Sequence, residues 1–252
     1  MKNSYNCITK IENNEAKMQL FIFHHAGGSS ANYKNLAKKF SNLFEIILVD
    51  LPGRGKRFQE LMPETLNEII EDLAYPISQT ICKPFVFFGH SLGSHISYRI
   101  LAELEREFYQ SASLFFPSGA NSPSYVAHHG FKSTSRSSFL ELLYDLIYLG
   151  GVSKEFMKDE VMVQHMVNLY RLDLKIFDDL KNYEIPILSC PIISLGSNKD
   201  NVVNPAALYG WSSVTRSYFE SQIMDGNHFY IYDQEFELVS FIKDRISNLV
   251  IL

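Results

Sequence analysis

Cysteine is scarce in this chain of 252 residues, which holds three: Cys7, Cys82 and Cys190. They lie far apart and none stands in a C-x-x-C pair, so the sequence favours neither a disulfide framework nor a zinc site. We therefore expect a protein without a bound metal that works in a reducing compartment, the cytoplasm.

Long apolar runs and basic clusters are also lacking. No segment reaches the about 18 to 20 apolar residues that a membrane helix needs, and residues 1–17 have no apolar stretch typical of a signal peptide. The formal net charge is −5, and the densest basic cluster is the Lys-Arg pair inside Gly53–Arg57. Because nucleic-acid binders carry a basic face, we do not expect a nucleic acid as partner, and the missing apolar runs argue against a membrane. We expect a soluble, cytoplasmic protein that acts as a monomer.

Short apolar runs, in contrast, recur along the chain. Six of them are rich in β-branched and aromatic residues and predict strands: Met18–Phe23, Phe44–Val49, Phe85–Gly89, Ala112–Pro117, Pro191–Gly196 and Thr215–Met224. The spacing of apolar residues between and after them predicts helices: Tyr33–Phe40, Leu66–Gln79, Leu92–Phe108 and Phe236–Asn248. Apolar strands without alternation are covered on both faces. We predict an α/β fold in which residues 1–252 form one domain around a mostly parallel central sheet flanked by helices.

The segment from residue 121 to residue 183 departs from this alternation. It contains no predicted strand, and a serine-rich loop, Lys132–Ser138, leads into two helical stretches, Ser138–Leu149 and Lys158–Asp179. Because the sheet resumes near Cys190, extra helices at this point cover the carboxyl ends of the strands, where α/β proteins bind ligands. We predict an inserted helical lid; the alternative is an ordinary packing layer of helices.

The strongest functional pattern is a G-x-S-x-G sequence, Gly89–Gly93. It directly follows the apolar strand residues Phe85–Phe88 and begins a helix. A sharp strand-to-helix turn needs small residues on both sides of a strained nucleophile, and the helix N-terminus favours a developing negative charge. Ser91 is therefore the predicted nucleophile; the alternative is a glycine-rich turn with an incidental serine.

A serine hydroxyl needs a base, and the base needs a carboxylate that orients it. His228 is the last of the eight histidines and follows the last predicted strand, in a Gly-Asn turn. Asp200 follows the strand Pro191–Gly196, which gives the chain order Ser, Asp, His that is typical of the α/β-hydrolase fold. We predict His228 as the base and Asp200 as its partner. The competing carboxylates are Asp225, close to His228 in sequence, and Asp173, Asp178 and Asp179 in the predicted lid.

Acyl transfer also needs two donors aimed at the oxyanion. The N–H of Leu92, directly after the nucleophile, is one candidate. The other is the N–H of Ala26, because the small residues of the loop His24–Ser30 let the backbone approach a substrate. This loop has no G-x-G-x-x-G or Walker lysine pattern, so it is not expected to bind the phosphates of a nucleotide cofactor.

Together these residues resemble a known family, the type II thioesterases that accompany nonribosomal peptide and polyketide synthetases. The resemblance runs from Phe23 to Tyr230 and includes two elements that separate the family from generic esterases, Leu51–Arg57 and Leu149–Gly151. It implies an α/β-hydrolase that removes stalled acyl groups from the phosphopantetheine arm of acyl or peptidyl carrier proteins. It also implies that the enzyme needs no cofactor of its own.

The family's reacting groups correspond to residues already singled out. Its nucleophile, acid and base map onto Ser91, Asp200 and His228, and its oxyanion donors map onto Ala26 and Leu92. The sequence departs from the usual family pattern without losing a reacting group at three positions: His25, Asn201 and Asn227.

The acyl pocket is expected under the lid. Methionine side chains are flexible and adapt to different acyl groups, so we expect Met162 and Met166, together with His25, to line it. Attack, oxyanion and acyl-enzyme are the same for esters and thioesters, and only the family resemblance favours thioesters. The alternatives are a carboxylesterase or lipase acting on small esters, and a non-catalytic binding protein of the same fold.

Overall fold

A seven-stranded sheet forms the centre of the molecule in the computed structural model, which describes residues 5–129, 134–149, 156–180 and 184–249. The strand order is β1-β3-β2-β4-β5-β6-β7; β1 runs antiparallel to β3, and the pairs from β3 to β7 are parallel. The strands are β1 (Ile8–Ile11), β2 (Met18–Phe23), β3 (Phe44–Val49), β4 (Phe85–His90), β5 (Leu114–Ser118), β6 (Ile192–Ser197) and β7 (Phe219–Met224). The predicted mostly parallel sheet is confirmed.

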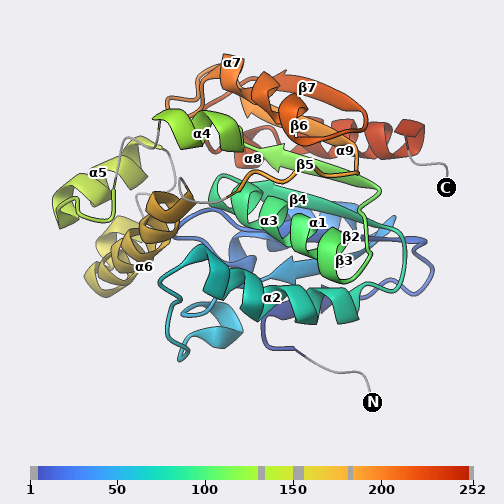
Figure 1. Cartoon of the computed structure of the whole chain (residues 1–252). Coiled ribbons are helices and arrows are strands. Elements are labelled where there is room, and N and C mark those ends of the chain that lie inside the picture. The colour runs from blue at the N-terminus through green and yellow to red at the C-terminus, as the bar shows by residue number, and fades with distance from the viewer. Residues whose placement is uncertain (1–4, 130–133, 150–155, 181–183, 250–252) are drawn as a thin grey trace.

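Helices cover both faces of this sheet (Figure 1). They are α1 (Lys34–Phe40), α2 (Leu66–Thr80), α3 (Leu92–Glu107), α4 (Pro123–His129), α5 (Phe139–Tyr148), α6 (Glu160–Asp179), α7 (Pro205–Leu208), α8 (Tyr230–Asp233) and α9 (Glu235–Leu249). Short 3-10 turns are η1 (Ser30–Tyr33), η2 (Gly55–Arg57), η3 (Phe156–Lys158) and η5 (Tyr209–Val214). The four helices predicted outside the insertion correspond to α1, α2, α3 and α9.

Two hydrophobic cores lie on opposite faces of the sheet because successive strand residues point to opposite sides. Phe21 and Phe87 belong to the core that includes α2 and α3, whereas Ile22 and Phe88 belong to the core that includes α1 and α9. Both faces of β2 and β4 are therefore apolar and buried. This explains why these strands read as continuous apolar runs rather than alternating ones.

The edges of the sheet differ from the sequence prediction. Strand β1 was not predicted, because it has only four residues and only Ile8 among them is buried. The last strand was predicted from Thr215 but begins at Phe219, and only Met224 of β7 is buried. An edge strand needs less apolar surface than a central one. Neither edge strand therefore shows the continuous apolar run that predicted the inner strands.

The described part of the insertion between β5 and β6 is helical. The predicted stretches Ser138–Leu149 and Lys158–Asp179 correspond to α5 and α6, and α4 is an additional helix. Ser138 begins α5 with a capping box, in which its hydroxyl accepts the Glu141 N–H and the Glu141 carboxylate accepts the Ser138 N–H. Figure 1 shows α5 and α6 together at the end of the sheet toward which β5 points. Residues 132, 133, 150 and 151 of the predicted loop and Leu-Gly-Gly element lie outside the described residues.

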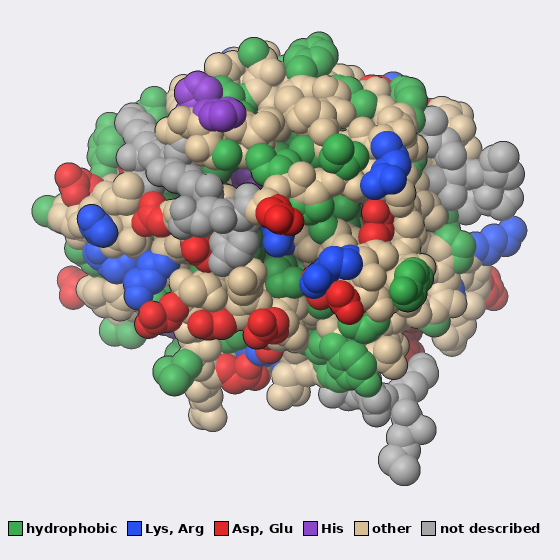
Figure 2. All heavy atoms as spheres, in the orientation of Figure 1, with side chains coloured by type: hydrophobic (Ala, Val, Ile, Leu, Met, Phe, Trp, Pro, Cys, Tyr) green, Lys and Arg blue, Asp and Glu red, His purple; other side chains and the backbone are tan. Residues whose placement is uncertain are grey.

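The face of the molecule in Figure 2 carries charges of both signs. On the face in Figure 2, Lys and Arg side chains are interspersed with Asp and Glu. No helix within the described ranges is both long and apolar enough to cross a membrane.

Candidate active site

Ser91 stands in the turn between β4 and α3 with a backbone φ of 55° and ψ of −118°. This is an unusual conformation for a residue other than glycine. A Cβ atom on Gly89 would lie 2.4 Å from the Gly93 carbonyl oxygen, and one on Gly93 would lie 2.4 Å from the Phe23 carbonyl oxygen. Both glycines of the G-x-S-x-G pattern are therefore required by close backbone approach, which lets α3 start directly against β2.

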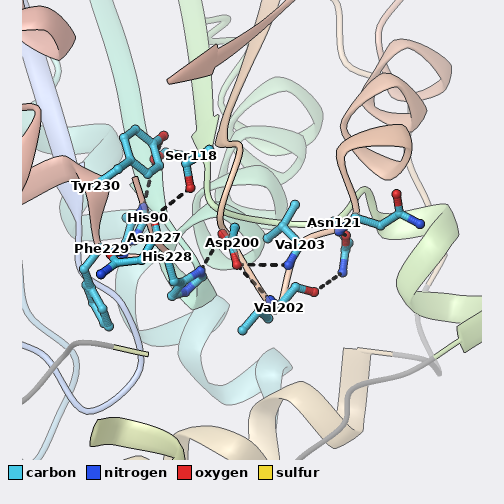
Figure 3. Close-up of polar contacts among 12 residues, drawn as sticks. His90, Ser118, Asn121, Asp200, Val202, Val203, Asn227, His228, Phe229 and Tyr230 are labelled. Atoms are coloured by element: carbon cyan, nitrogen blue, oxygen red, sulfur yellow. Dashed lines mark hydrogen bonds and ion pairs between the residues drawn. The ribbon is translucent and has the colours of Figure 1, made fainter. Parts of the chain in front are cut away.

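His228 and Asp200 contact each other directly. The Nδ1 atom of His228 lies 2.8 Å from Asp200 Oδ2, and the two side chains are 4% and 0% exposed. The other oxygen, Asp200 Oδ1, accepts the N–H groups of Val202 at 2.8 Å and Val203 at 3.1 Å (Figure 3). A carboxylate held on both oxygens orients the imidazole, so that Nδ1 donates to it and Nε2 is the atom that can accept a proton.

Ser91 and His228 line one cavity of about 370 Å³. His25 and Ala26 border it from the loop after β2, and α4 contributes Tyr125 and His129. Figure 2 shows histidine side chains at the surface over α4. The remaining lining residues are Asn121, Asp145, Leu146, Tyr148, Leu149, Tyr170, Leu174, Phe177, Asn201, Val202 and Phe229. The arrangement is a concave, mainly apolar site with a few convergent polar groups.

The two methionines expected in the pocket do not line this cavity. Met162 is 46% exposed near the start of α6, and Met166 packs partly buried against the core. The cavity is instead contacted by Tyr170, Leu174 and Phe177 of the same helix. A helix rises about 1.5 Å per residue, so Met162 lies roughly 12 Å before Tyr170 along its axis. The prediction for Met162 and Met166 is corrected accordingly.

The loop that carries Ala26 is anchored at several points. Asp50, at the end of β3, accepts the Ser30 N–H on Oδ1 and the Ser30 hydroxyl on Oδ2, each at 2.7 Å. His24 donates from Nδ1 to the His25 carbonyl at 2.8 Å and accepts the Leu51 N–H on Nε2 at 3.4 Å. Burial lowers the pKa of His24 to about 3, so this imidazole is neutral. Ala26 lies in this fixed loop, and Leu92 is the first residue of α3, whose first N–H groups have no partner inside the helix.

A buried polar network that sequence reasoning missed lies beneath His228. Ser118 Oγ is 2.8 Å from His90 Nδ1 and 2.7 Å from the Tyr230 hydroxyl (Figure 3). The His90 ring lies 5.2 Å from the His228 ring, centroid to centroid. Burial, reinforced by the positive charges that His228 and His25 can carry, holds the pKa of His90 well below its usual range. His90 is thus a neutral residue whose ring packs close to that of the base, His228.

A second missed feature is a buried ion pair between the insertion and the core. Arg54, of the Leu51–Arg57 element, donates to both oxygens of Asp173 on α6, from Nη1 and Nη2, each at 2.8 Å. Asp173 is one of the competing carboxylates considered for the triad. It does not contact His228 but is held by Arg54 and by the N–H of Gly27.

The other competing carboxylates also have partners elsewhere. Asp225 is 60% exposed and lies 3.2 Å from Lys199 Nζ. Asp178 accepts a hydrogen bond from the Ser135 hydroxyl, and Asp179 accepts one from the Leu66 N–H. Over the residues that the structure describes, no group of three or more His, Cys, Asp or Glu side chains could hold a metal ion.

Comparisons with known proteins show which family this chain belongs to. The model of the thioesterase domain family matches residues 18–246. Linear gramicidin dehydrogenase LgrE of Brevibacillus parabrevis is 27% identical over 240 residues, which cover 94% of this chain and 90% of that protein. Gramicidin S biosynthesis protein GrsT of Aneurinibacillus migulanus is 26% identical over 235 residues, 93% of this chain and 91% of that one.

A solved structure extends the comparison to the fold. The type II thioesterase BorB from the borrelidin biosynthetic cluster superposes with a TM-score of 0.86 at 25% identity, covering 96% of this chain and 98% of BorB. The predicted α/β-hydrolase fold is thereby confirmed.

Proposed function

Because the chain belongs to the thioesterase domain family, we propose that it hydrolyses acyl thioesters on the phosphopantetheine arm of acyl or peptidyl carrier proteins in nonribosomal peptide and polyketide assembly lines. The observation that carries the proposal is the contact of His228 with Asp200 at the wall of the cavity that Ser91 also lines. The name of BorB and the role of GrsT in gramicidin S biosynthesis support the assembly-line setting. The name of LgrE describes a dehydrogenase. The proposal follows the family and not that name, because the loop 24–30 lacks a nucleotide-binding pattern.

In the proposed reaction, Ser91 Oγ attacks the thioester carbonyl carbon while His228 Nε2 takes the hydroxyl proton. The N–H groups of Ala26 and Leu92 stabilise the oxyanion, and Asp200 stabilises the imidazolium. Collapse of the tetrahedral intermediate breaks the C–S bond, and His228 returns the proton to the departing thiol. Water, deprotonated by His228, then attacks the acyl-Ser91 ester, which releases the carboxylic acid and restores the serine.

Thioesters suit this machinery. A thiolate is a better leaving group than an alkoxide or an amine, because a thiol is the stronger acid, and it needs less help from a general acid. No metal or cofactor takes part in these steps. We propose that the enzyme acts as a cytoplasmic monomer and that the insertion of residues 121–183 is a lid over the acyl pocket.

The proposal is tested by comparing one acyl group on three carriers: a carrier protein, a small thiol and a simple alcohol. We expect kcat/KM to be highest for the acylated carrier protein, lower for the small thioester and lowest for the ester. An equal or higher value for the plain ester would instead identify a carboxylesterase. Binding of the carrier protein without hydrolysis of any of the three would identify a non-catalytic binding protein.

A further inference from the structure

Among the ion pairs of the described residues, the one between Arg54 and Asp173 joins the insertion to the sheet domain and is deeply buried. The two side chains are 2% and 0% exposed, and their two hydrogen bonds run in parallel. Taking both charges out of water is costly, and an apolar pair of similar volume is often as stable or more so. A contribution to the stability of the fold alone therefore does not explain why a charged pair stands at this position.

Its other contacts lie in the loop that carries Ala26. Asp173 Oδ2 accepts the N–H of Gly27 at 2.6 Å, and Arg54 Nη1 donates to the Gly28 carbonyl at 3.1 Å. Gly27 has a φ of 73°, and a Cβ atom there would lie 3.5 Å from Cβ of Tyr170, so α6 packs directly on this turn. The pair thus holds the loop by both a donor and an acceptor, at the residues that follow Ala26.

The remaining anchors of this loop come from the sheet domain. His24 and Ser30 are bonded by Leu51 and Asp50, which follow β3. Asp173, in contrast, belongs to α6 of the insertion. The middle of the loop is therefore bonded by a helix that is separate from the strands presenting Ser91 and His228.

We propose that Asp173 and Arg54 are positioning residues for the oxyanion hole: seated on α6, Asp173 fixes the Gly27 peptide and so the direction of the Ala26 N–H. The inference rests on the proposed function, in which that N–H binds the oxyanion. It makes the oxyanion hole complete only when α6 lies against the loop, and so couples the insertion to the chemical step.

The test replaces the pair with apolar residues of similar volume, Arg54→Met with Asp173→Leu. The matched control is Arg57→Met with Asp72→Leu, because Arg57 makes the same two-bond contact with Asp72 of α2, at 2.6 and 2.8 Å, and does not bond the loop 24–30. Thermal denaturation, kcat and KM on a small acyl thioester, and hydrogen exchange of the Gly27 amide are measured for both. If the double variant does not fold, Arg54→Leu with Asp173→Val and Arg57→Leu with Asp72→Val replace the two, because these smaller apolar pairs also remove the acceptor of the Gly27 N–H.

We expect kcat of the Arg54/Asp173 variant to fall about 10- to 100-fold, which does not exceed the fall in kcat when a whole oxyanion donor is removed. KM should change less than about threefold. Its Gly27 amide should exchange at least about tenfold faster than in the wild type, because its acceptor is gone. The control should keep both kcat and Gly27 protection.

Equal kcat and equal Gly27 exchange in the two variants would overturn the inference, and so would fast Gly27 exchange with unchanged kcat. A merely structural pair predicts a change in melting temperature alone. If the wild type hydrolyses no thioester, the proposed function fails and with it the catalytic role. The exchange comparison then still decides whether Asp173 holds the loop.

Discussion

At the residue scale, the site depends on how Asp200 is held. Its Oδ1 accepts two backbone N–H groups of the turn that follows, and its Oδ2 faces His228 Nδ1. Both oxygens are thus engaged before any substrate arrives, and the imidazole has one orientation. The carboxylate fixes the tautomer in which Nδ1 carries the proton and lowers the energy of the imidazolium that forms during attack.

Asp200→Asn should lower kcat by about 10² to 10⁴, because the amide favours the wrong tautomer of His228 and cannot stabilise its cation. The measurement is steady-state hydrolysis of a small thioester at saturating concentration. Asp225→Asn is the control, since Asp225 is exposed and paired with Lys199, and kcat should change little. The reverse order of effects would mean that Asp225 is the partner of His228.

Residues in local motifs were predictable, and residues in long-range contacts were not. Ser91 stands in a five-residue pattern between a strand and a helix, and the chain order of Asp200 and His228 follows from the fold. The contact of Asp173 with Gly27 joins residues that are 146 positions apart. No local spacing reveals such a contact, and a carboxylate on a lid helix suggested at most a competitor of Asp200.

At the element scale, α6 forms one wall of the cavity. Tyr170, Leu174 and Phe177 lie at spacings of four and three residues and so share one face of the helix. The sequence indicated the helix and its apolar content correctly. It did not indicate which turns lie over the cavity, because Met162 and Met166 have the same apolar character but lie nearer the start of the helix.

Leu174→Phe should shorten the acyl chains that are hydrolysed best, because a larger side chain fills part of the cavity that Leu174 lines. The measurement is kcat/KM over a series of acyl lengths on one small thiol. Met162→Phe, on the same helix but outside the cavity, is the matched control and should keep the wild-type profile. A profile that changes with Met162→Phe and not with Leu174→Phe would place the pocket elsewhere.

At the scale of the whole molecule, the two cores bury histidines as neutral groups. His95 lies on α3 with its ring 6.0 Å from that of Trp211 and 5.9 Å from that of Phe177. Burial lowers its pKa from 6.5 to about 3. The unfolded chain therefore takes up a proton at a pH where the native protein does not. The stability that this provides is complete above about pH 6.5 and is lost as the pH falls toward 3.

His95→Gln should flatten the loss of stability in acid. One such histidine contributes a slope of about 1.4 kcal/mol per pH unit between the two pKa values, and the variant lacks it. The free energy of unfolding is measured by urea denaturation at a series of pH values from about 6.5 down to 4. His128→Gln, at an exposed position on α4, is the control and should keep the wild-type slope. A slope unchanged by His95→Gln would show that His95 is not buried as a neutral group.

The inner part of the fold was predictable for the same reason that it is stable. Strands β2, β3 and β4 are buried between two layers of helices, and such strands are apolar along most of their length. Strand β1 contains Thr9 and Lys10 and lies at the edge, where pairing with β3 rather than burial defines it. The sequence therefore predicted the central strands of the sheet and the chain order of Ser91, Asp200 and His228. It did not predict the edge strand β1.

The central claim is that Ser91 forms a covalent acyl-enzyme, and mass spectrometry tests it most directly. The protein is mixed with an acyl thioester, quenched within one turnover, digested and mapped. The account predicts one acyl group on the peptide that contains Ser91, and neither adduct nor turnover in Ser91→Ala, with the fold retained by circular dichroism. An acyl group on any other residue, or turnover that survives in Ser91→Ala, would contradict it.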